Sequence, residues 1–402
     1  MRDIIISEAT VVGADAVRRA PLHMCDGRVS AASPRRDTWR ITLADQLVFP
    51  GLVNAHDHLH LNSFPPLPLA APFPNSYAWI KALQPYLADL AAGAANAPSR
   101  AQRHHHGALK NLLAGTTTVQ HHDPWRPELG EAWFPARVQR NYHWSHSLGM
   151  GLGSVERSGL PLYGPEVRAS FAATPPGEPW IIHLAEGTDA DAEAELSRLE
   201  ELGCLADNTL LVHGVGLRSS DQEKVIRYGT GVIWCPSSNL AILGRTLEPR
   251  RLFEAGRLTL GTDSRLSGAR DLLEELKIAR VHSGLTPREL LSLVTGAAAR
   301  LLRMPLVGSL EAGCHADLIV LRDTGGDPYQ QLLSATRGDL RAVVRGGTPA
   351  LADPDFAEWF AVCGVETVGA RLDGREKLLA RAYVSGTVAD PLPEAGLELL
   401  DD

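Results

Sequence analysis

Short apolar runs recur through the central part of the chain, and the residue that ends each run is polar. Each run has the length of a buried β-strand. Helical patterns lie between the later runs, at 191–202 and 220–228, and a further strand is expected at 232–235. Strands that alternate with helices are typical of a parallel sheet. The four clearest runs end at His56, His183, His213 and Asp263.

The first of these runs ends in two histidines that are separated by a single residue, His56 and His58. Alternate side chains of a strand point to the same face, so both imidazoles can reach one point. Neutral imidazoles suit a divalent transition metal such as zinc, although a solvated strand end would look the same in sequence. The other polar strand ends favour the metal, because a (β/α)8 barrel gathers its active site at the carboxyl ends of its strands.

The composition narrows the class of protein. The 402 residues suffice for one large barrel and a small accessory domain. The net charge is -8 and the charges are mixed, so nothing favours nucleic acid, and no apolar run is long enough to span a membrane. The first residues lack a secretory apolar core. Five scattered cysteines favour reduced thiols in a cytoplasmic enzyme rather than a disulfide framework.

Seven segments, in their order along the chain, resemble the amidohydrolase superfamily of metal-dependent hydrolases. Within it, the likeness is greatest to the cytosine, guanine and S-adenosylhomocysteine deaminases and the triazine hydrolases. The segments are PGLVNAHDH (50–58), GTTTV (115–119), IIHLAEG (181–187), LLVHGVGL (210–217), WCPSSN (234–239), LGTDSRLSG (260–268) and VGSLEAGCHADLIVL (307–321).

The resemblance implies an α/β fold, a distorted (β/α)8 TIM barrel with a small β-sandwich built from both terminal segments. The barrel would span 49–306, and the composite sandwich would take 1–48 and 307–402. Strand-like patterns at both ends agree with this division. A third strand is plausible at 137–144, but 146–180 shows no clear fourth strand, so a degenerate or very short fourth unit is expected. The acidic, proline-rich end at 390–402 is expected to be a loosely held tail.

The resemblance also assigns a metal site. His56 and His58 match the pair after the first strand, His183 matches the fifth-strand ligand and Asp263 the eighth-strand ligand. One divalent ion per subunit, Zn2+ or else Fe2+, would activate a water. Dinuclear relatives add a carboxylated lysine on the fourth strand. Lys81 and Lys110, the only lysines before His183, are not placed there, so a single ion is expected.

Three residues receive catalytic roles from the same resemblance. Asp263, close to the water, would accept its proton, and Glu186 would carry a proton to the ring nitrogen and the leaving group. His213 would polarise the substrate or hold the hydroxide in line. A solvated loop carboxylate and a core histidine are the plain alternatives for Glu186 and His213.

Further residues are candidates for substrate contact. His121 and His122 follow the second strand and should lie at the pocket mouth, and Trp125 adds an aromatic surface nearby. Arg245 could pair with an anionic group or lie on the surface. The proline-rich segment 61–79 is expected to form an apolar wall. The run 104–106, three histidines, is expected to be a solvated helix face.

The predicted function is hydrolysis of a C–N bond other than a peptide bond, most simply deamination of an amino-substituted N-heterocycle by a metal-activated hydroxide. Hydrolysis of a cyclic amide, or of a halide or thioether substituent, is the alternative on the same site. A non-catalytic scaffold is disfavoured because the matched metal ligands are all present. The expected partner is a small-molecule substrate, with no nucleic acid or membrane, and the family habit suggests a homodimer.

Overall fold

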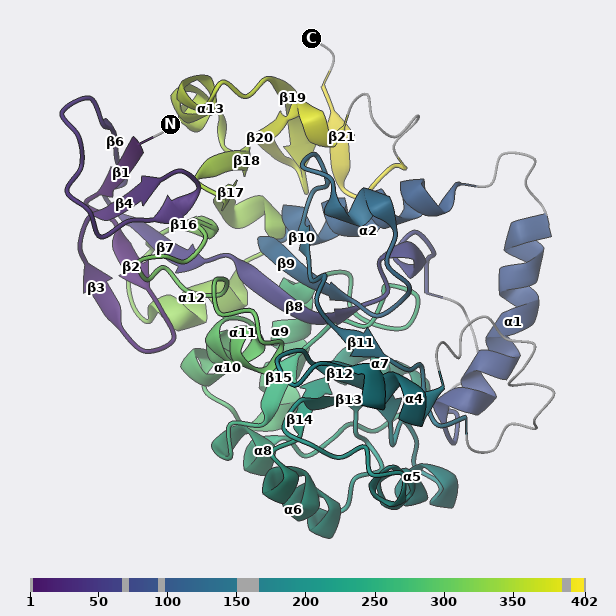
Figure 1. Cartoon of the computed structure of the whole chain (residues 1–402). Coiled ribbons are helices and arrows are strands. Elements are labelled where there is room, and N and C mark those ends of the chain that lie inside the picture. Colours follow the sequence, from purple (N-terminus) through teal and green to yellow (C-terminus); the bar gives the residue numbers. More distant parts are fainter. Residues whose placement is uncertain (1–2, 67–71, 93–97, 150–165, 385–391, 401–402) are drawn as a thin grey trace.

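The computed structural model describes residues 3–66, 72–92, 98–149, 166–384 and 392–400 (Figure 1). Parts of the expected apolar wall (67–71), of the glycine-rich stretch after 149 and of the C-terminal tail lie outside these ranges. Among the described helices, none is both long and apolar enough to cross a membrane.

The two ends of the chain share one nine-stranded sheet with the order β21-β19-β20-β18-β17-β16-β7-β2-β3. The link between the ends is the antiparallel pair of β7 and β16, in which Phe49 lies opposite Ile319. The strands are β2 (Thr10–Val12), β3 (Val17–Arg19), β7 (Gln46–Pro50), β16 (Leu318–Arg322), β17 (Leu340–Arg345), β18 (Thr348–Ala352), β19 (Thr367–Leu372), β20 (Arg375–Ala380) and β21 (Leu397–Leu399).

A smaller sheet from the N-terminal segment packs against this one. It has the order β5-β4-β1-β6 and shares one apolar core with the large sheet, in which Ile4, Ile6 and Met24 meet Val48 and Val320. Apolar residues alternate with exposed ones in β4, as in a strand with one buried face. Its strands are β1 (Asp3–Ser7), β4 (Leu22–Cys25), β5 (Arg28–Val29) and β6 (Trp39–Thr42).

The central part of the chain forms two parallel sheets, β10-β9-β8 and β11-β12-β13-β14-β15. Their strands are almost fully buried, which explains the continuous apolar runs of the sequence. The strands are β8 (Leu52–Asp57), β9 (Thr116–His121), β10 (Arg137–Val138), β11 (His143–Trp144), β12 (Trp180–Leu184), β13 (Thr209–His213), β14 (Gly231–Trp234) and β15 (Leu258–Leu260).

The carboxyl ends of β8 and β15 lie side by side. The amides of Thr262 and Asp263 donate to the carbonyl of His56 at 3.0 Å each, and the amide of His58 donates to the carbonyl of Asp263 at 2.7 Å. A parallel bridge joins Asp57 and Asp263. The polar residues after the first and last parallel strands are therefore brought together by backbone hydrogen bonds.

Helices follow most of the parallel strands (Figure 1). Ser99 caps α2, where its side chain and that of Gln102 form a capping box. Asp189 caps α5 in the same position, and Gly229 ends α6 in the left-handed conformation. The main helices are α1 (Ser76–Ala92), α2 (Arg100–Leu113), α4 (Val167–Ala173), α5 (Ala190–Glu201), α6 (Ser219–Tyr228), α7 (Pro236–Leu243), α8 (Arg250–Glu254), α9 (Leu272–Ser283), α10 (Pro287–Leu293), α11 (Gly296–Leu301), α12 (Pro328–Ser334) and α13 (Ala357–Cys363).

The third and fourth parallel strands differ from the sequence prediction. A single strand was predicted at 137–144, but two short strands are found, β10 and β11, each of two residues. β10 pairs with β9, and β11 pairs with β12. A strand of two residues is too short to produce an apolar run or an alternation that could be recognised in the sequence.

The tail prediction is wrong for the described residues 392–400. Glu394 is buried, and the guanidinium of the buried Arg337 donates to its Oε1 at 2.6 Å. His106 Nε2 lies 3.0 Å from the other carboxylate oxygen, Oε2. β21 also pairs with β19, so buried ion pairs and strand pairing fix a segment whose composition looked solvated.

Candidate metal centre

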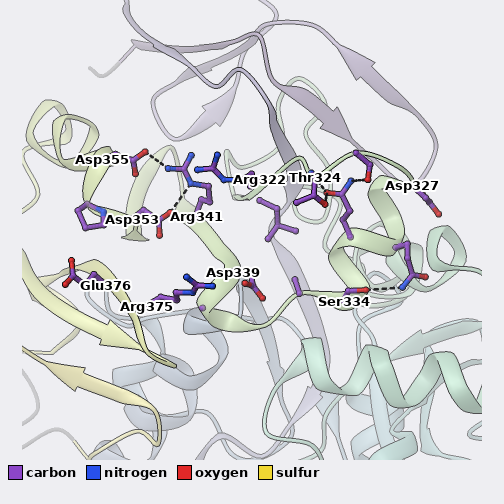
Figure 2. A pocket seen from close by; sticks show the side chains of 17 residues that line it. Arg322, Thr324, Asp327, Ser334, Asp339, Arg341, Asp353, Asp355, Arg375 and Glu376 are labelled. Carbon is purple, nitrogen blue, oxygen red and sulfur yellow. Dashed lines mark hydrogen bonds and ion pairs between the residues drawn. The ribbon is translucent and has the colours of Figure 1, made fainter.

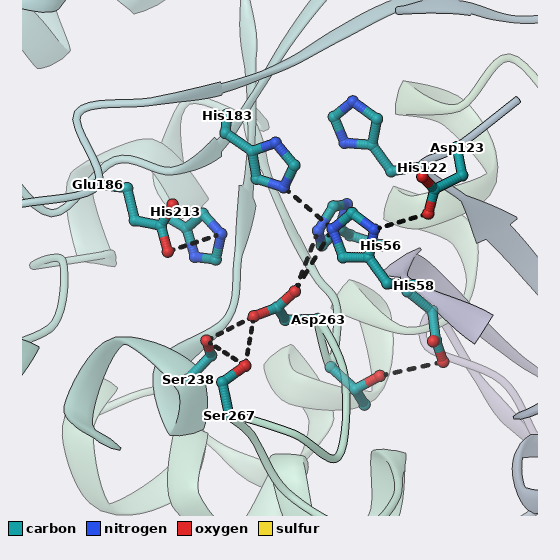
Figure 3. A network of polar contacts seen from close by, with 12 residues as sticks. His56, His58, His122, Asp123, His183, Glu186, His213, Ser238, Asp263 and Ser267 are labelled. Carbon is teal, nitrogen blue, oxygen red and sulfur yellow. Dashed lines mark hydrogen bonds and ion pairs between the residues drawn. The ribbon is translucent and has the colours of Figure 1, made fainter. Parts of the chain in front are cut away.

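Four side chains from three separate parts of the chain converge at the carboxyl ends of the parallel strands (Figure 3). His56 lies on β8 and His58 follows the end of that strand, His183 lies on β12, and Asp263 follows β15. His58 Nε2 lies 3.2 Å from His183 Nε2. Oδ1 of Asp263 lies 3.6 Å from Nε2 of His56 and 3.6 Å from Nε2 of His58.

These distances fit one ion at the centre of the group. Donors in a tetrahedral site with metal–nitrogen bonds of about 2.0–2.1 Å lie roughly 3.3 Å from one another. Ligand atoms of His56, His58 and His183 all lie within 4.8 Å of one another, as do those of His56, His213 and Asp263. Both ring nitrogens of His56 are buried without a hydrogen-bond partner among the described residues, which is costly unless a cation binds there. The residues present can therefore hold a metal ion.

Neighbouring groups orient each of these side chains. Nδ1–H of His58 donates to Asp123 Oδ2 at 3.0 Å, and Nδ1–H of His183 donates to the carbonyl of His146 at 2.7 Å. In the neutral form of each ring, these contacts leave the lone pair on Nε2, directed at the centre. Such outer contacts fix the tautomer of a metal-binding histidine.

The carboxylate of Asp263 is held in the same way. Its Oδ2 accepts hydrogen bonds from Ser238 at 2.6 Å and from Ser267 at 2.7 Å, which leaves Oδ1 facing the histidines. Ser238 belongs to α7 and Ser267 to the loop after β15. Two hydroxyls thus fix which oxygen is presented to the centre.

The backbone is strained where three of the parallel strands end. Ala185, His213 and Asp263 have φ values of 53°, 76° and 60°, in the left-handed region that favours glycine. Such conformations persist only where the surroundings impose them, and they cluster at functional sites. The strain turns the chain sharply after β12, β13 and β15, so that polar side chains project into one space.

Glu186 and His213 form a second pair beside the histidines. His213 Nε2 lies 3.4 Å from Glu186 Oε1. Nδ1–H of His213 donates to Asn239 Oδ1 at 2.8 Å, so the lone pair lies on Nε2. The pair can pass a proton between the carboxylate and the imidazole at the cavity wall.

Burial governs the protonation of the centre. It lowers the pKa of His56 to about 3 and the pKa of His183 well below its usual value, so both rings are neutral and able to bind a cation. Burial opposes ionisation of Asp263, but the surrounding histidines outweigh it and hold the pKa of that carboxyl far below its ordinary value. Burial raises the pKa of Glu186. One carboxyl is therefore set up to stay ionised and the other to exchange protons.

The centre opens into a small cavity of about 70 Å³. Its apolar side comes from Leu61, Trp79, Ile80 and Leu83, most of them on α1, and its polar side includes Glu186, His213 and Asp263. The described part of the expected apolar wall therefore borders the site. Pockets for drug-sized ligands usually measure roughly 300–1,000 Å³, so this cavity is smaller than such pockets.

A larger hollow of about 880 Å³ lies elsewhere, between β16, β17, β18, β20 and α12 (Figure 2). Arg341 in its wall pairs with Asp353 at 2.9 Å and also with Asp355. No histidine or cysteine is among the residues that line it. The charged groups of this hollow neutralise one another and do not form a catalytic arrangement. The larger of the two cavities is therefore not the candidate active site.

None of the four predicted substrate contacts lies among the residues that line the small cavity. His122 stacks on His183 with a centroid separation of 4.4 Å, and so supports that ring from behind. His121 is fully buried, Trp125 packs beside Arg140, and Arg245 is exposed after α7. Substrate contact by these residues stays a prediction.

Several residues at the site were not singled out from the sequence. Asp123 borders the cavity, and Ser238 and Asn239 orient Asp263 and His213. Ser238 and Asn239 lie in the family-like segment WCPSSN, and Asp123 follows two histidines at the end of a strand. These residues could have been proposed as site residues from the sequence, but the side chains that they orient could not have been predicted.

The prediction of a solvated histidine face at 104–106 is wrong. His104, His105 and His106 have relative exposures of 1%, 3% and 3%. His104 contacts His121 at the end of β9, and His106 contacts the buried Glu394. The run looked polar in sequence because the partners that bury it come from distant segments.

Comparison with known proteins agrees with this geometry. The sequence model of the amidohydrolase family matches residues 173–354. 8-Oxoguanine deaminase from Pseudomonas aeruginosa is 29% identical over 226 residues, which cover 51% of this chain and 49% of that enzyme. The chain thus matches about half the length of this curated relative. This similarity to the amidohydrolase family covers a little under half of the chain.

Two solved structures show the same fold over most of the chain. An adenosine deaminase from Xanthomonas campestris, with bound zinc, has a TM-score of 0.68 and 21% identity, covering 90% of this chain and 96% of the other. Atrazine chlorohydrolase from Arthrobacter aurescens, complexed with zinc, has a TM-score of 0.71 and 20% identity, with coverages of 89% and 99%. At these identities the likeness concerns the fold.

Proposed function

We propose that this protein is a metal-dependent hydrolase that deaminates an amino-substituted N-heterocycle. The observation that carries the proposal is the convergence of His56, His58, His183 and Asp263, with Glu186 and His213 across the same cavity. The deaminase among the relatives, which matches 51% of this chain, supports the reaction class. The ion we propose is a single Zn2+ at this centre, as in the two zinc-containing neighbours of similar fold.

We also propose that the two parallel sheets form one distorted (β/α)8 barrel. The bridge between Asp57 and Asp263 and the hydrogen bonds between β8 and β15 support closure on that side. Residues 49–306 would form this barrel domain. Residues 1–48 and 307–402 would form the β-sandwich, which the shared apolar core of the two terminal sheets supports.

The metal, when bound by the three histidines and Asp263, supplies a water whose pKa is lowered towards neutrality. Asp263 stays ionised and presents Oδ1 to the centre, so it can accept the proton that this water loses. Ser238 and Ser267 hold the opposite oxygen, which prevents the carboxylate from turning away.

Glu186 moves a second proton. Burial raises its pKa, which favours the protonated form that donates to a ring nitrogen of the substrate. The carboxylate so formed can then take the remaining proton of the attacking hydroxyl group and pass it to the departing amine, which leaves as ammonia. His213, whose tautomer Asn239 fixes, lies beside that carboxylate and orients the substrate at the attacked carbon. The apolar side of the cavity suits the flat face of a ring.

The homodimer expected from family habit remains a proposal, as do the small-molecule partner and the absence of nucleic-acid and membrane partners. A cytoplasmic location is proposed from the cysteines, each of which has a free thiol in the structure.

The direct test is ammonia release from purines, pyrimidines, pterins and triazines by zinc-loaded protein. Deamination predicts ammonia in step with the change of ring absorbance for at least one compound. Absorbance changes without ammonia across the whole panel would contradict deamination and favour ring opening or loss of a halide or thioether group.

A further inference from the structure

A second group of histidines lies next to the metal centre, outside the proposed mechanism. His60 lies in the short 3-10 helix η1 (Leu59–Leu61), His104 in α2 and His121 at the end of β9. Their relative exposures are 4%, 1% and 0%. Three buried imidazoles from three elements are unusual, because imidazole is polar and has to find partners.

The three rings also converge on one another. One ring nitrogen of each lies within 4.8 Å of those of the other two. The ring planes are close to perpendicular, at 90° for His60 and His104, 83° for His60 and His121, and 76° for His104 and His121. In the first centre, the ring of His56 makes comparable angles of 89° and 83° with its two partners.

Each of the three histidines has a buried ring nitrogen without a hydrogen-bond partner among the described residues. These atoms are Nδ1 of His60, Nε2 of His104 and Nε2 of His121. If they were ordinary packed histidines, each would leave a polar atom unsatisfied at the same place in the fold. One cation would satisfy all three.

The neighbours of His104 direct a lone pair inward, because its Nδ1–H donates to Glu128 Oε1 at 2.9 Å and leaves the lone pair on Nε2. Nδ1 of His121 lies 3.2 Å from the amide of Leu59, which donates to it, and 3.3 Å from the carbonyl of Asp57. A metal on Nε2 of His121 therefore requires the tautomer in which Nδ1–H donates to the Asp57 carbonyl and the Leu59 hydrogen bond is given up. Carboxylate and carbonyl partners of this kind commonly orient metal-binding histidines.

A carboxylate lies between the two groups of histidines. Asp123 Oδ2 is 3.3 Å from His60 Nδ1 and accepts the hydrogen bond of His58 Nδ1 at 3.0 Å. With Glu128 on the far side, two carboxylates offset the charge of a cation among these rings.

We propose that His60, His104 and His121 bind a second divalent transition-metal ion, which Asp123 couples to the first centre. Imidazole nitrogens suit Zn2+, Co2+ or Ni2+. Of the three histidines only His60 lines the cavity, so the ion would be closed off from substrate. Its role is structural: it ties η1, α2 and β9 together and so positions the carboxylate that orients His58.

The test is the metal content of the full chain after reconstitution with Zn2+ and removal of loosely bound ions. Wild type is expected to retain close to two equivalents, and His104→Gln close to one. His105→Gln is the matched control, because His105 is the next residue of the same helix and equally buried but contacts Trp133 and Phe134 instead. It should retain two. One equivalent in wild type that His104→Gln leaves unchanged would overturn the proposal.

A milder variant guards against misfolding. Glu128→Gln keeps the size of a side chain that is 19% exposed and removes the carboxylate from His104. It is expected to weaken the second ion about 10–100-fold in a competition titration with a chromophoric chelator, with the first ion unchanged. Equal affinities for both ions in Glu128→Gln and wild type would contradict the proposal.

The two centres can fail separately. His183→Ala should retain the one ion held by His60, His104 and His121. If wild type held one equivalent that His104→Gln removed and His183→Ala did not, the second site would stand and the proposed catalytic centre would fall. If His183→Ala held no ion, the second site would be overturned.

Discussion

The two histidine clusters of this protein use the same kind of donor in different surroundings. His58 and His183, which converge with His56, line a cavity that also contains a proton-exchanging carboxylate, Glu186. His104 and His121 are sealed between α2 and β9, with His60 in the wall between the clusters. Closed metal sites stabilise folds and open ones perform chemistry. The comparison teaches that access and nearby proton carriers, rather than the number of imidazoles, distinguish a reactive centre from a structural one.

The largest effect that separates the clusters is expected from His183→Ala. Loss of this ligand removes the ion of the open centre, which supplies several kcal/mol of transition-state stabilisation. Turnover of the active panel compound should fall at least about a thousandfold. Elemental analysis and a thermal melt check that the fold survives. Turnover within tenfold of wild type would show that the open cluster is not the reactive one.

Glu186→Gln should give the next largest effect. The amide keeps the shape but cannot exchange a proton, so kcat should fall about 10²–10⁴-fold while the metal content stays at the wild-type value. Parallel measurements of kcat and bound metal separate the two roles. Unchanged kcat would remove Glu186 from the mechanism and make the open cluster a metal site only.

Asn239→Leu tests how far orientation matters in the open centre. The side chain can no longer accept the hydrogen bond of His213 Nδ1, so the ring loses its fixed tautomer. We expect a decrease of about 10–100-fold in kcat/KM. Ser238→Ala, which removes one of two hydrogen bonds to Asp263, is the comparison variant and should cost less. An Asn239→Leu enzyme as active as wild type would show that His213 needs no orientation.

The last prediction concerns pH and stability near the open centre rather than catalysis. Burial raises the pKa of Glu275 from 4.5 to about 8, and this carboxyl accepts a hydrogen bond from the amide of Ser237 at 2.9 Å. The folded state holds the proton more tightly than the unfolded state, so stability is lost as pH rises from about 4.5 towards 8. Denaturant unfolding of Glu275→Gln should show a flatter slope in this window, by up to about 1.4 kcal/mol per pH unit. Identical slopes would contradict the assignment.

The sequence predicted those parts of the site that lie at the ends of long, regular strands. His56, His183, His213 and Asp263 each follow an apolar run, and such runs are visible without a structure. Backbone turns with positive φ then bring the polar residues to one place, as at His213 and Asp263. The prediction from sequence is therefore correct where the apolar run and the functional residue belong to the same strand.

The sequence failed where burial depends on distant partners. The histidines at 104–106 are covered by β9, by the aromatic residues Trp133 and Phe134, and by the C-terminal Glu394. Arg337 likewise fixes a tail segment that looked solvated. Side-chain pairs between remote segments have no local pattern, so only the folded chain reveals them.

The most direct test of the account is a crystal of zinc-loaded protein measured above and below the zinc absorption edge. The account predicts an anomalous peak between His56, His58, His183 and Asp263, and a separate one between His60, His104 and His121. No anomalous peak among His56, His58, His183 and Asp263 in zinc-loaded crystals would contradict the central claim that this chain is a metal-dependent hydrolase.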